Sequence, residues 1–196
     1  SGHVRIYQYN NNSWSQLGSD IDGEAANDIS GHSVSLSSDG SRVAIGAPIN
    51  DGTSGNSNDN RGHVRIYQYN NNSWSQLGAD IDGEATDDQS GWSVSLSSDG
   101  SRVAVGAYNN DGAGTNSGHV RIFDYTPSGT SSWTQVGGDI DGEAVNDASG
   151  RSVSISGDGS RVAIGAYTND GNGGNSGHVR VYSLKGETYQ YAWDVD

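Results

Sequence analysis

Apolar and polar residues alternate along short stretches of this chain, and the same stretches return about every 58 residues. The repeat is marked by Gly-His-Val-Arg, which begins at Gly2, Gly62, Gly118 and Gly177. Its first copy holds four alternating stretches, at residues 4–9, 14–22, 33–37 and 42–45. Alternation with a period of two predicts β-strands, each with one face buried.

Turn residues separate these predicted strands. An Asn-rich turn at residues 10–12 follows the first strand, and Asp39-Gly40 joins the third strand to the fourth. No long segment has apolar residues at helical spacing. The sequence therefore predicts an all-β fold of β-propeller blades, each of four antiparallel strands, with about three and a half blades in the chain. The rival fold is a parallel β-solenoid, whose coils are usually shorter and lack hairpins inside each repeat.

Composition limits the core and the partners. The 196 residues include 30 Gly, no Met, no Cys and one Phe, so burial must be modest and repeated in every blade. Asp and Glu number 24 against 10 Lys and Arg. This excess excludes nucleic acid as a partner, and no apolar run is long enough for membrane insertion. An acidic surface suits divalent cations or basic partners, and simple solubility explains it equally well.

Three motifs resemble FG-GAP repeats, the blades of integrin α-subunit propellers and of many bacterial surface proteins. They are residues 28–34, 43–48 and 62–67, and they recur along nearly the whole chain. The chain is a divergent member, because serine stands where the family has the Phe of Phe-Gly, and the Pro of Gly-Ala-Pro survives only at Pro48.

The resemblance implies the order of strands in each blade. Residues 33–37 would lie innermost, followed by residues 42–45, then the Val-Arg-Ile-Tyr strand, with the Trp-bearing strand outermost. The chain then divides into two outer strands of a partial blade (1–22) and three blade repeats (23–82, 83–141, 142–196), all of one propeller-type domain. Because the chain begins at Ser1 inside a repeat, we expect a processed or excised piece. Its open sheet edges predict self-association, further blades or a partner.

Calcium is the cofactor that the acidic motifs predict. The calcium loop of the family cannot be carried over, because residues 38–41 form a short turn with one carboxylate. Two other loops, at one end of each blade, are rich in carboxylates, and Asp20, Asp22 and Glu24 could converge there. Equally, these residues are ordinary turn formers that Arg5, Arg65 and Arg121 could neutralise. The candidate metal ligands are Asp20, Asp22, Glu24, Asp28, Asp51, Asp80, Asp82, Glu84, Asp88, Asp111, Asp139, Asp141, Glu143, Asp147 and Asp170.

Positions that vary inside the fixed motifs are candidates for ligand binding. One position holds His32, Trp92 or Arg151, and another holds Pro48, Tyr108 or Tyr167. Exposed aromatic rings beside polar residues suit stacking on a sugar or gripping a partner loop, although neutral drift explains the variation as well. Residues that repeat unchanged have a structural interpretation. The tryptophans are expected to pack the blades and the histidines to form hydrogen bonds: Trp14, Trp74, Trp133, Trp193, His3, His63, His119 and His178.

No motif for catalysis or phosphate binding is present, and nearly every reactive residue is copied in each repeat. We therefore expect no enzyme but an extracellular or cell-surface module for binding, adhesion or structural assembly, possessing a protein or glycan partner. One alternative is a carbohydrate-binding lectin propeller, which needs Trp92, Tyr108 and Tyr167 exposed and close together. The other is a non-catalytic propeller within a larger secreted enzyme.

Overall fold

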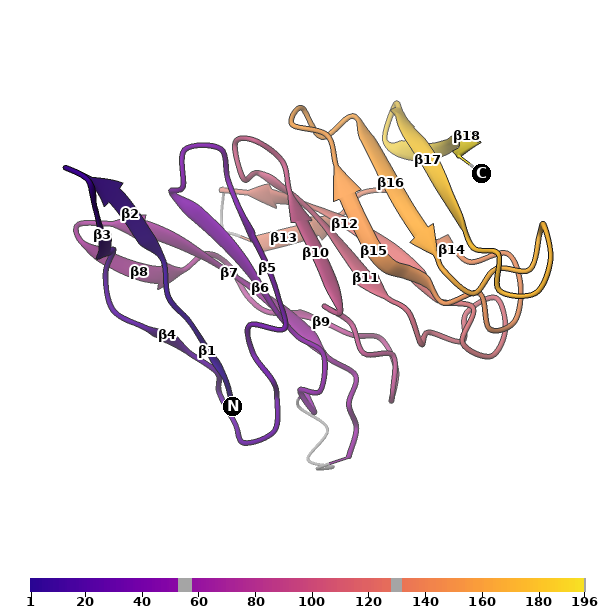
Figure 1. Ribbon diagram of the computed structural model, residues 1–196, viewed down its shortest axis with the longest axis horizontal. Helices are drawn as coiled ribbons and strands as arrows, with labels where there is room; N and C mark the ends of the chain where they lie inside the picture. Colours follow the sequence, from indigo (N-terminus) through magenta and orange to yellow (C-terminus); the bar gives the residue numbers. More distant parts are fainter. Residues whose placement is uncertain (53–57, 128–131, 196) are drawn as a thin grey trace.

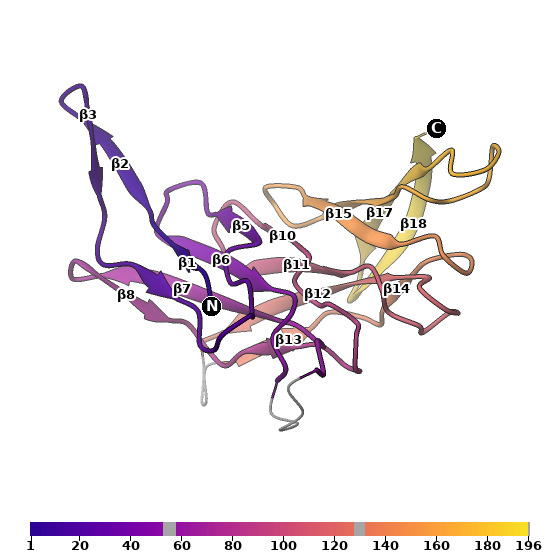
Figure 2. The ribbon, with the colours of Figure 1, turned by 60° about the horizontal axis from the view of Figure 1, so that its bottom comes forward.

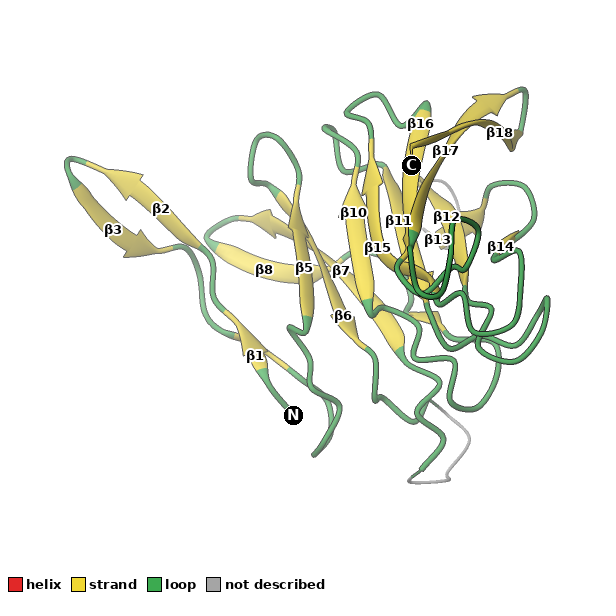
Figure 3. Ribbon diagram, turned by 45° about the vertical axis from the view of Figure 1, so that its right-hand side comes forward, coloured by secondary structure: helices red, strands yellow, loops and turns green. Residues whose placement is uncertain are grey.

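The computed structural model describes residues 1–52, 58–127 and 132–195, and strands account for all of its regular structure (Figure 1, Figure 3). Asp196, the last residue of the predicted third repeat, lies outside the described residues. Within the described residues no helix could span a membrane. The strands of the partial blade and the first blade are β1 (His3–Val4), β2 (Tyr7–Asn10), β3 (Ser13–Gln16), β4 (Ile21–Asp22), β5 (Ser33–Leu36), β6 (Arg42–Ala47), β7 (His63–Asn70), β8 (Ser73–Gln76) and β9 (Ile81–Asp82).

Two more blades follow along the chain. The second blade comprises β10 (Ser93–Leu96), β11 (Arg102–Ala107), β12 (His119–Thr126), β13 (Ser132–Gln135) and β14 (Ile140–Asp141). The third comprises β15 (Ser149–Ile155), β16 (Arg161–Ala166), β17 (His178–Lys185) and β18 (Thr188–Val195). Each is an antiparallel sheet in sequence order, and the partial blade supplies two outer strands (Figure 2). The predicted all-β fold of four-stranded blades is confirmed.

The outermost strand differs from the prediction. The stretch 14–22 was expected to form one strand, but β3 and β4 are separate, as are β8 and β9 and also β13 and β14. The break falls at Gly18, whose φ of 74° is left-handed. There the side chain of Gln16 donates to the Gly18 carbonyl and, at 2.7 Å, to Asp20. Strand β18 lacks this glycine and runs on with one irregularity in its register.

The hydrophobic core lies between blades rather than within them. Ala44, Val64 and Ile66 of the first blade pack against Val94 and Leu96 of the second. The second and third blades repeat this contact through Ala104, Val120, Ile122, Ile155 and Val162. Each interface is small, as the low apolar content requires, and a blade is stable only when its neighbours cover it.

Small residues let the inner strands of neighbouring blades approach each other. The Ser33 hydroxyl donates to the Gly91 carbonyl at 2.7 Å, and Ser35 accepts from the Leu96 amide at 2.9 Å. A side chain at Gly46 would collide with the Gly91 carbonyl. The same bonds join the second and third blades. Alternating serines therefore serve as the hydrogen-bonding seam along the inner strands, β5, β10 and β15.

One tryptophan does not have the predicted register. Trp74 lies opposite Tyr69 and donates through Nε1 to the Leu17 carbonyl of the partial blade at 2.7 Å. Trp133 makes the equivalent bond to Leu77 at 2.8 Å. In the third blade Tyr189 takes this position, because it lies opposite Leu184. Trp193 instead pairs with Val181 and is 46% exposed.

Both ends of the array leave apolar strands uncovered. On β5, Val34 and Leu36 are 53% and 49% exposed, whereas their equivalents on β10, Val94 and Leu96, are 9% and 7% exposed. On the third blade Val179 is 37% exposed. The partial blade and the third blade lie at opposite ends of the array (Figure 1). The open edges expected from the sequence are therefore present at both ends of the described chain.

Candidate functional site

The loop after the second strand of a blade and the loop entering that blade lie at the same end, as predicted. Asn50 donates to Asp28 at 3.2 Å, and Asp28 in turn accepts from the Ala25 amide at 2.9 Å. Both side chains are buried. The same pairs recur in the other blades, between Asn110 and Asp88 and between Asn169 and Asp147. These three aspartates are therefore engaged in holding the loops together.

Other predicted metal ligands also shape the loops or pair with arginine. Asp51, Asp111 and Asp170 accept backbone amides of their own loops, at 2.7–3.1 Å. The Arg5 guanidinium donates to Asp20 at 2.9 Å and, together with Gln16, lowers the pKa of Asp20 to about 2. The predicted pairing of Arg5 with a carboxylate is thus confirmed at Asp20.

Asp20, Asp22 and Glu24 do not converge, because the break at Gly18 and the turn after β4 separate them. Asp20 faces Arg5 of its own blade, whereas Glu24 lies 3.4 Å from Arg65 of the next blade. Arg65 also donates to the Asp22 carbonyl at 2.9 Å. Arg121 repeats both contacts, with Glu84 at 3.4 Å and the Asp82 carbonyl at 2.6 Å. These arginines clamp each blade to the preceding one.

The remaining predicted ligands gather around histidines rather than around one another. Glu24 and Asp80 lie beside His63, Glu84 and Asp139 beside His119, and Glu143 beside His178. Asp141 lies next to Gly112, and burial followed by the charge of Asp139 raises its pKa. His63 and His119 are buried, but Nδ1 of His119 has no hydrogen-bond partner among the described residues, so the hydrogen-bonding role predicted for it is not borne out.

The five predicted ligand-binding residues come together in one cluster. Ring centroids of His32 and Trp92 are 4.3 Å apart, and those of Trp92 and Tyr108 are 4.5 Å apart. The Arg151 guanidinium carbon lies 4.3, 4.7 and 5.2 Å from the centroids of Trp92, Tyr108 and Tyr167. We call His32, Trp92, Tyr108, Arg151 and Tyr167 the aromatic cluster. It spans three blades at their acidic end.

Exposure differs within the aromatic cluster. His32 and Tyr167 are exposed, the latter by 55%, while Trp92, Tyr108 and Arg151 are half-buried. Within the described part of the chain, the side chain of Arg151 makes neither an ion pair nor a hydrogen bond, unlike the side chains of most other arginines. Its N–H donors are therefore free for a ligand. Trp92 contacts both His32 and Arg151, and Tyr167 is more exposed than Trp92 or Tyr108.

A pocket of about 230 Å³ lies beside this cluster, between the second and third blades. Tyr108 and Tyr167 flank it, and Asn109, Asn116 and Asn146 line it with Ala148 and Thr168. We call it the tyrosine pocket. The three asparagine side-chain amides make no hydrogen bond to another described residue. At the preceding interface Pro48 replaces the tyrosine, and Asn60 is tied to Asp87 at 3.0 Å.

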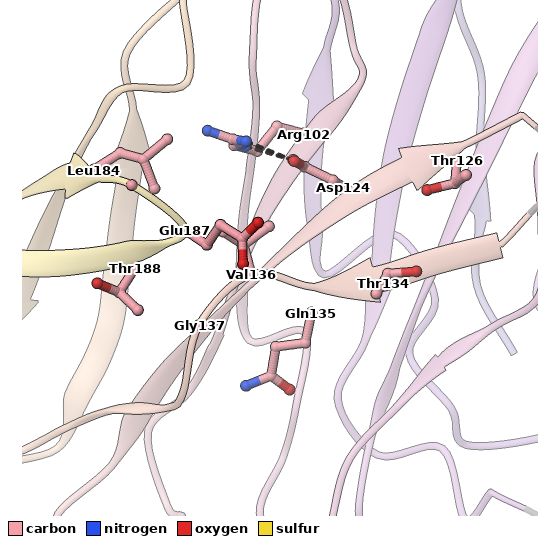
Figure 4. Close-up of a pocket in the computed structure, with 11 residues that line it drawn as sticks. Arg102, Asp124, Thr126, Thr134, Gln135, Val136, Gly137, Leu184, Glu187 and Thr188 are labelled. Carbon is pink, nitrogen blue, oxygen red and sulfur yellow. Dashed lines mark hydrogen bonds and ion pairs between the residues drawn. The ribbon is translucent and has the colours of Figure 1, made fainter.

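A larger hollow, of about 440 Å³, lies toward the opposite end of the same two blades (Figure 4). Its lining includes Val136, Leu184 and the ion pair between Arg102 and Asp124. The hollow exists where the third blade has Tyr189 in place of the packing tryptophan. The Tyr189 hydroxyl donates to the Gly159 carbonyl and lies 3.2 Å from Arg102. The register of Tyr189 was the signal that sequence reasoning missed.

Comparison with known proteins agrees with these blades. Residues 79–123 and 140–182 match the FG-GAP repeat family. The chain contains FG-GAP repeats. The two matched stretches run from the end of one blade into the next, and so include the seam residues of β10 and β15 and the arginine clamp made by Arg121. A search of curated proteins gave no match.

Solved structures share the fold of these FG-GAP repeats. A candidate 6-phosphogluconolactonase from Bacteroides uniformis superposes with a TM-score of 0.63 and 13% identity, over 98% of this chain and 48% of its own. A candidate 6-phosphogluconolactonase from Bacteroides fragilis superposes with a TM-score of 0.64 and 13% identity, over 100% of this chain and 49% of its own. Saccharomyces cerevisiae Sqt1 superposes with a TM-score of 0.51 and 12% identity, over 87% of this chain and 36% of its own. The chain thus spans about half the length of the first two, and identities this low show the fold alone.

Proposed function

We propose that these FG-GAP repeats form a non-enzymatic binding module of a secreted or cell-surface protein, and that the module holds a glycan in the tyrosine pocket. One observation carries the proposal. The positions that differ between repeats, while their surroundings stay fixed, gather around one interface between blades. Equivalent positions of neighbouring blades lie side by side, and the residues present there bring aromatic rings and an unpaired guanidinium together on one surface, as a binding site needs.

The chemistry of the tyrosine pocket suits a sugar. A volume of about 230 Å³ accommodates one sugar residue, with the rest of a glycan extending over the surface. The exposed ring of Tyr167 offers an apolar face for the C–H groups of a pyranose. Three unengaged asparagine amides provide both donors and acceptors for hydroxyl groups. Arg151 adds donors beside the rings, which favours glycans that carry a carboxylate.

An extracellular location and a role in adhesion belong to the same proposal. A glycan-binding module acts where glycans are displayed. The formal net charge of −14 disfavours binding to nucleic acid and to anionic membranes. Calcium stays a prediction of the sequence, since most of the predicted carboxylates have hydrogen-bonding or arginine partners. The described titratable groups recur from blade to blade, which favours binding over catalysis.

The glycan proposal is tested on an array of neutral and acidic oligosaccharides. Wild-type protein should bind a restricted set, and Tyr167→Ala should lose that binding. Tyr7→Ala is the matched control, because Tyr7 is also an exposed tyrosine (47%) but lies on the partial blade. Absence of binding to any glycan, or equal binding by Tyr167→Ala, would contradict the proposal.

Assembly through the third blade is a second candidate function, favoured by a groove on its open face. In the complete interfaces, the Ser-Gly turn of the following blade enters a groove formed by a serine, a glycine and a valine. Gly91 meets Ser33, Gly46 and Val64 in this way. The equivalent groove of the third blade, at Ser152, Gly165 and Val179, is open and has a volume of about 310 Å³. Its shape fits the Ser-Gly turn of a further FG-GAP blade.

Light scattering tests whether this groove joins copies of the chain. Self-assembly predicts a mass above the 20.4 kDa of one chain, and Gly165→Val should reduce the mass to one chain by filling the groove. Gly174→Val is the control, because a side chain there meets nothing within 4 Å. A wild-type monomer at all concentrations would contradict assembly of this chain with itself.

A further inference from the structure

Two groups of side chains lie at the interfaces between blades, outside the tyrosine pocket. One comprises Glu24, His63 and Asp80, and the other comprises Glu84, His119 and Asp139. We propose that each group binds one transition-metal ion, with Zn²⁺ as the preferred ion. The ion would join the chain segment that enters a blade to the third strand of the same blade. This inference does not depend on glycan binding.

The distances within each group suit shared ligands of one ion. Nδ1 of His63 lies 3.7 Å from Oδ2 of Asp80 and 3.9 Å from Oε2 of Glu24. Nδ1 of His119 lies 3.9 Å from Oδ2 of Asp139. These separations are too long for hydrogen bonds. Ligands about 2.0–2.2 Å from a tetrahedral ion lie roughly 3.3 Å from each other, so small rotations of the carboxylates would complete the site.

His119 provides the second, independent observation. It is 1% exposed, and its Nδ1, which lies 3.9 Å from Oδ2 of Asp139, has no hydrogen-bond partner among the described residues. A buried polar atom without a partner costs free energy unless something binds it.

Charges around the second group also favour a cation. Asp139, Asp88 and Asp141 lie near Glu84 and add negative charge, although Arg121 opposes them. Arg121 lies 3.4 Å from Oε1 of Glu84. In the first group Arg65 likewise approaches Oε1 of Glu24, whereas Oε2 faces His63. The arginine thus occupies one carboxylate oxygen and leaves the other for the ion.

The donor set selects the kind of metal. One imidazole nitrogen with two carboxylates is a ligand set of zinc and similar ions, with a fourth position left to water. Calcium requires six to eight oxygen ligands, which neither group supplies. Glu24 and Glu84 are partly exposed, at 46% and 44% of their side chains, so an ion can enter from solvent.

The third blade provides an internal control. His178 lies 3.7 Å from Glu143, but Arg180 pairs with Glu143 and also lies 3.4 Å from Asp194. The arginine therefore bridges both carboxylates that a metal would need. In the partial blade, Arg5 binds the equivalent Asp20. We accordingly expect two ions per chain rather than three or four.

Isothermal titration with Zn²⁺ tests the number of sites. Wild type should bind two ions per chain, and Glu24→Gln and Glu84→Gln should each bind one. Glu143→Gln should still bind two. These glutamates are partly exposed, so the variants should fold, which circular dichroism and the thermal midpoint can check. The double variant His63→Gln/His119→Gln should bind none, and Co²⁺ bound to wild type should give visible absorption that this double variant lacks.

Several results would overturn the proposal. Wild type that binds no Zn²⁺ at micromolar concentrations has no such sites. Two ions retained by folded Glu24→Gln and Glu84→Gln variants would place the ions elsewhere. Millimolar Ca²⁺ that displaces Zn²⁺ stoichiometrically, with the histidine double variant unaffected, would indicate an all-oxygen calcium site instead.

Discussion

The guanidinium carbon of Arg151 lies 4.3 Å from the centroid of the Trp92 ring. Both residues occupy the same position of the repeat, in neighbouring blades, so a position that differs between repeats becomes a contact between them. Replacing Arg151 with Ala should lower the free energy of unfolding by about 1–2 kcal/mol, because cation–π contacts to half-buried rings are lost. Urea denaturation measures the change. Lys185→Ala, whose exposed side chain has no aromatic ring beside it among the described residues, should change stability by less than about 0.5 kcal/mol, and an equal loss in both variants would contradict the interpretation.

Gly106 should tolerate no side chain. A Cβ at this position would meet the Gly150 carbonyl of the third blade and the Ser93 hydroxyl. We expect Gly106→Ala to destabilise the protein by about 1–3 kcal/mol, because the two blades must move apart. Gly174→Ala is the control, since nothing lies within 4 Å of its Cβ, and it should stay within about 0.5 kcal/mol of wild type. Thermal or urea unfolding that shows no difference between the two would refute the close approach of the inner strands.

Ser35→Ala tests the hydrogen-bonding seam. This change leaves the Leu96 amide without its acceptor and should cost about 1–2 kcal/mol. Ser154 is the equivalent residue of the third blade, where no following blade is present, and its hydroxyl has no partner within the described residues. Ser154→Ala should therefore be nearly neutral in the same denaturation experiment. Equal costs would mean that the serines act through local strand structure rather than through contact between blades.

Acid should weaken the hairpin turns. Asp99 accepts hydrogen bonds from the Ser101 amide and the Ser97 hydroxyl, and these bonds lower its pKa to about 2. The folded-state pKa lies below the unfolded value of about 3.9, so the stabilisation is present above pH 4 and is lost as the pH falls toward 2. The Asp99→Asn variant should be less stable than wild type at pH 7. The difference in the free energy of unfolding between the two proteins should be smaller at pH 2.

Urea unfolding at pH 7, 4 and 2 measures this effect. Glu187→Gln is the control, because the exposed Glu187 side chain makes no hydrogen bond to a described residue. A constant difference between Asp99→Asn and wild type at all three pH values would show that the Asp99 charge contributes nothing.

The repeat pattern predicted the strands well where burial and turn chemistry agree. Asn11 and Asn12 have the positive φ expected of an Asn-rich turn, and Asp39-Gly40 forms the expected hairpin. The alternation could not reveal the break at Gly18, because Ile21 keeps its apolar position on the far side of the break. Similarly, Trp193 looks like Trp74 in sequence, and only pairing with β17 shows that Tyr189 holds the packing position.

The candidate functional site was predicted only in part from the repeat pattern. Variation within a fixed motif identified the aromatic cluster, because equivalent positions of adjacent blades are neighbours in space. The tyrosine pocket was not predicted, because the sequence does not show that Asn116 and Asn146 stay unbonded where their equivalents at the preceding interface, Asn60 and Asp87, bond to each other. The groups around His63 and His119 were also missed. The carboxylates of each group were predicted as metal ligands, but the histidine lies far from the glutamate within the same repeat, and only the fold brings the two together.

Calorimetric titration tests whether the tyrosine pocket binds a glycan. The oligosaccharide selected on the array is titrated into wild type and into Tyr167→Ala. Binding of one glycan per chain, about tenfold weaker or more in Tyr167→Ala, would support the claim, since about 1.4 kcal/mol corresponds to a tenfold change in affinity. Equal affinity in the two proteins would contradict it.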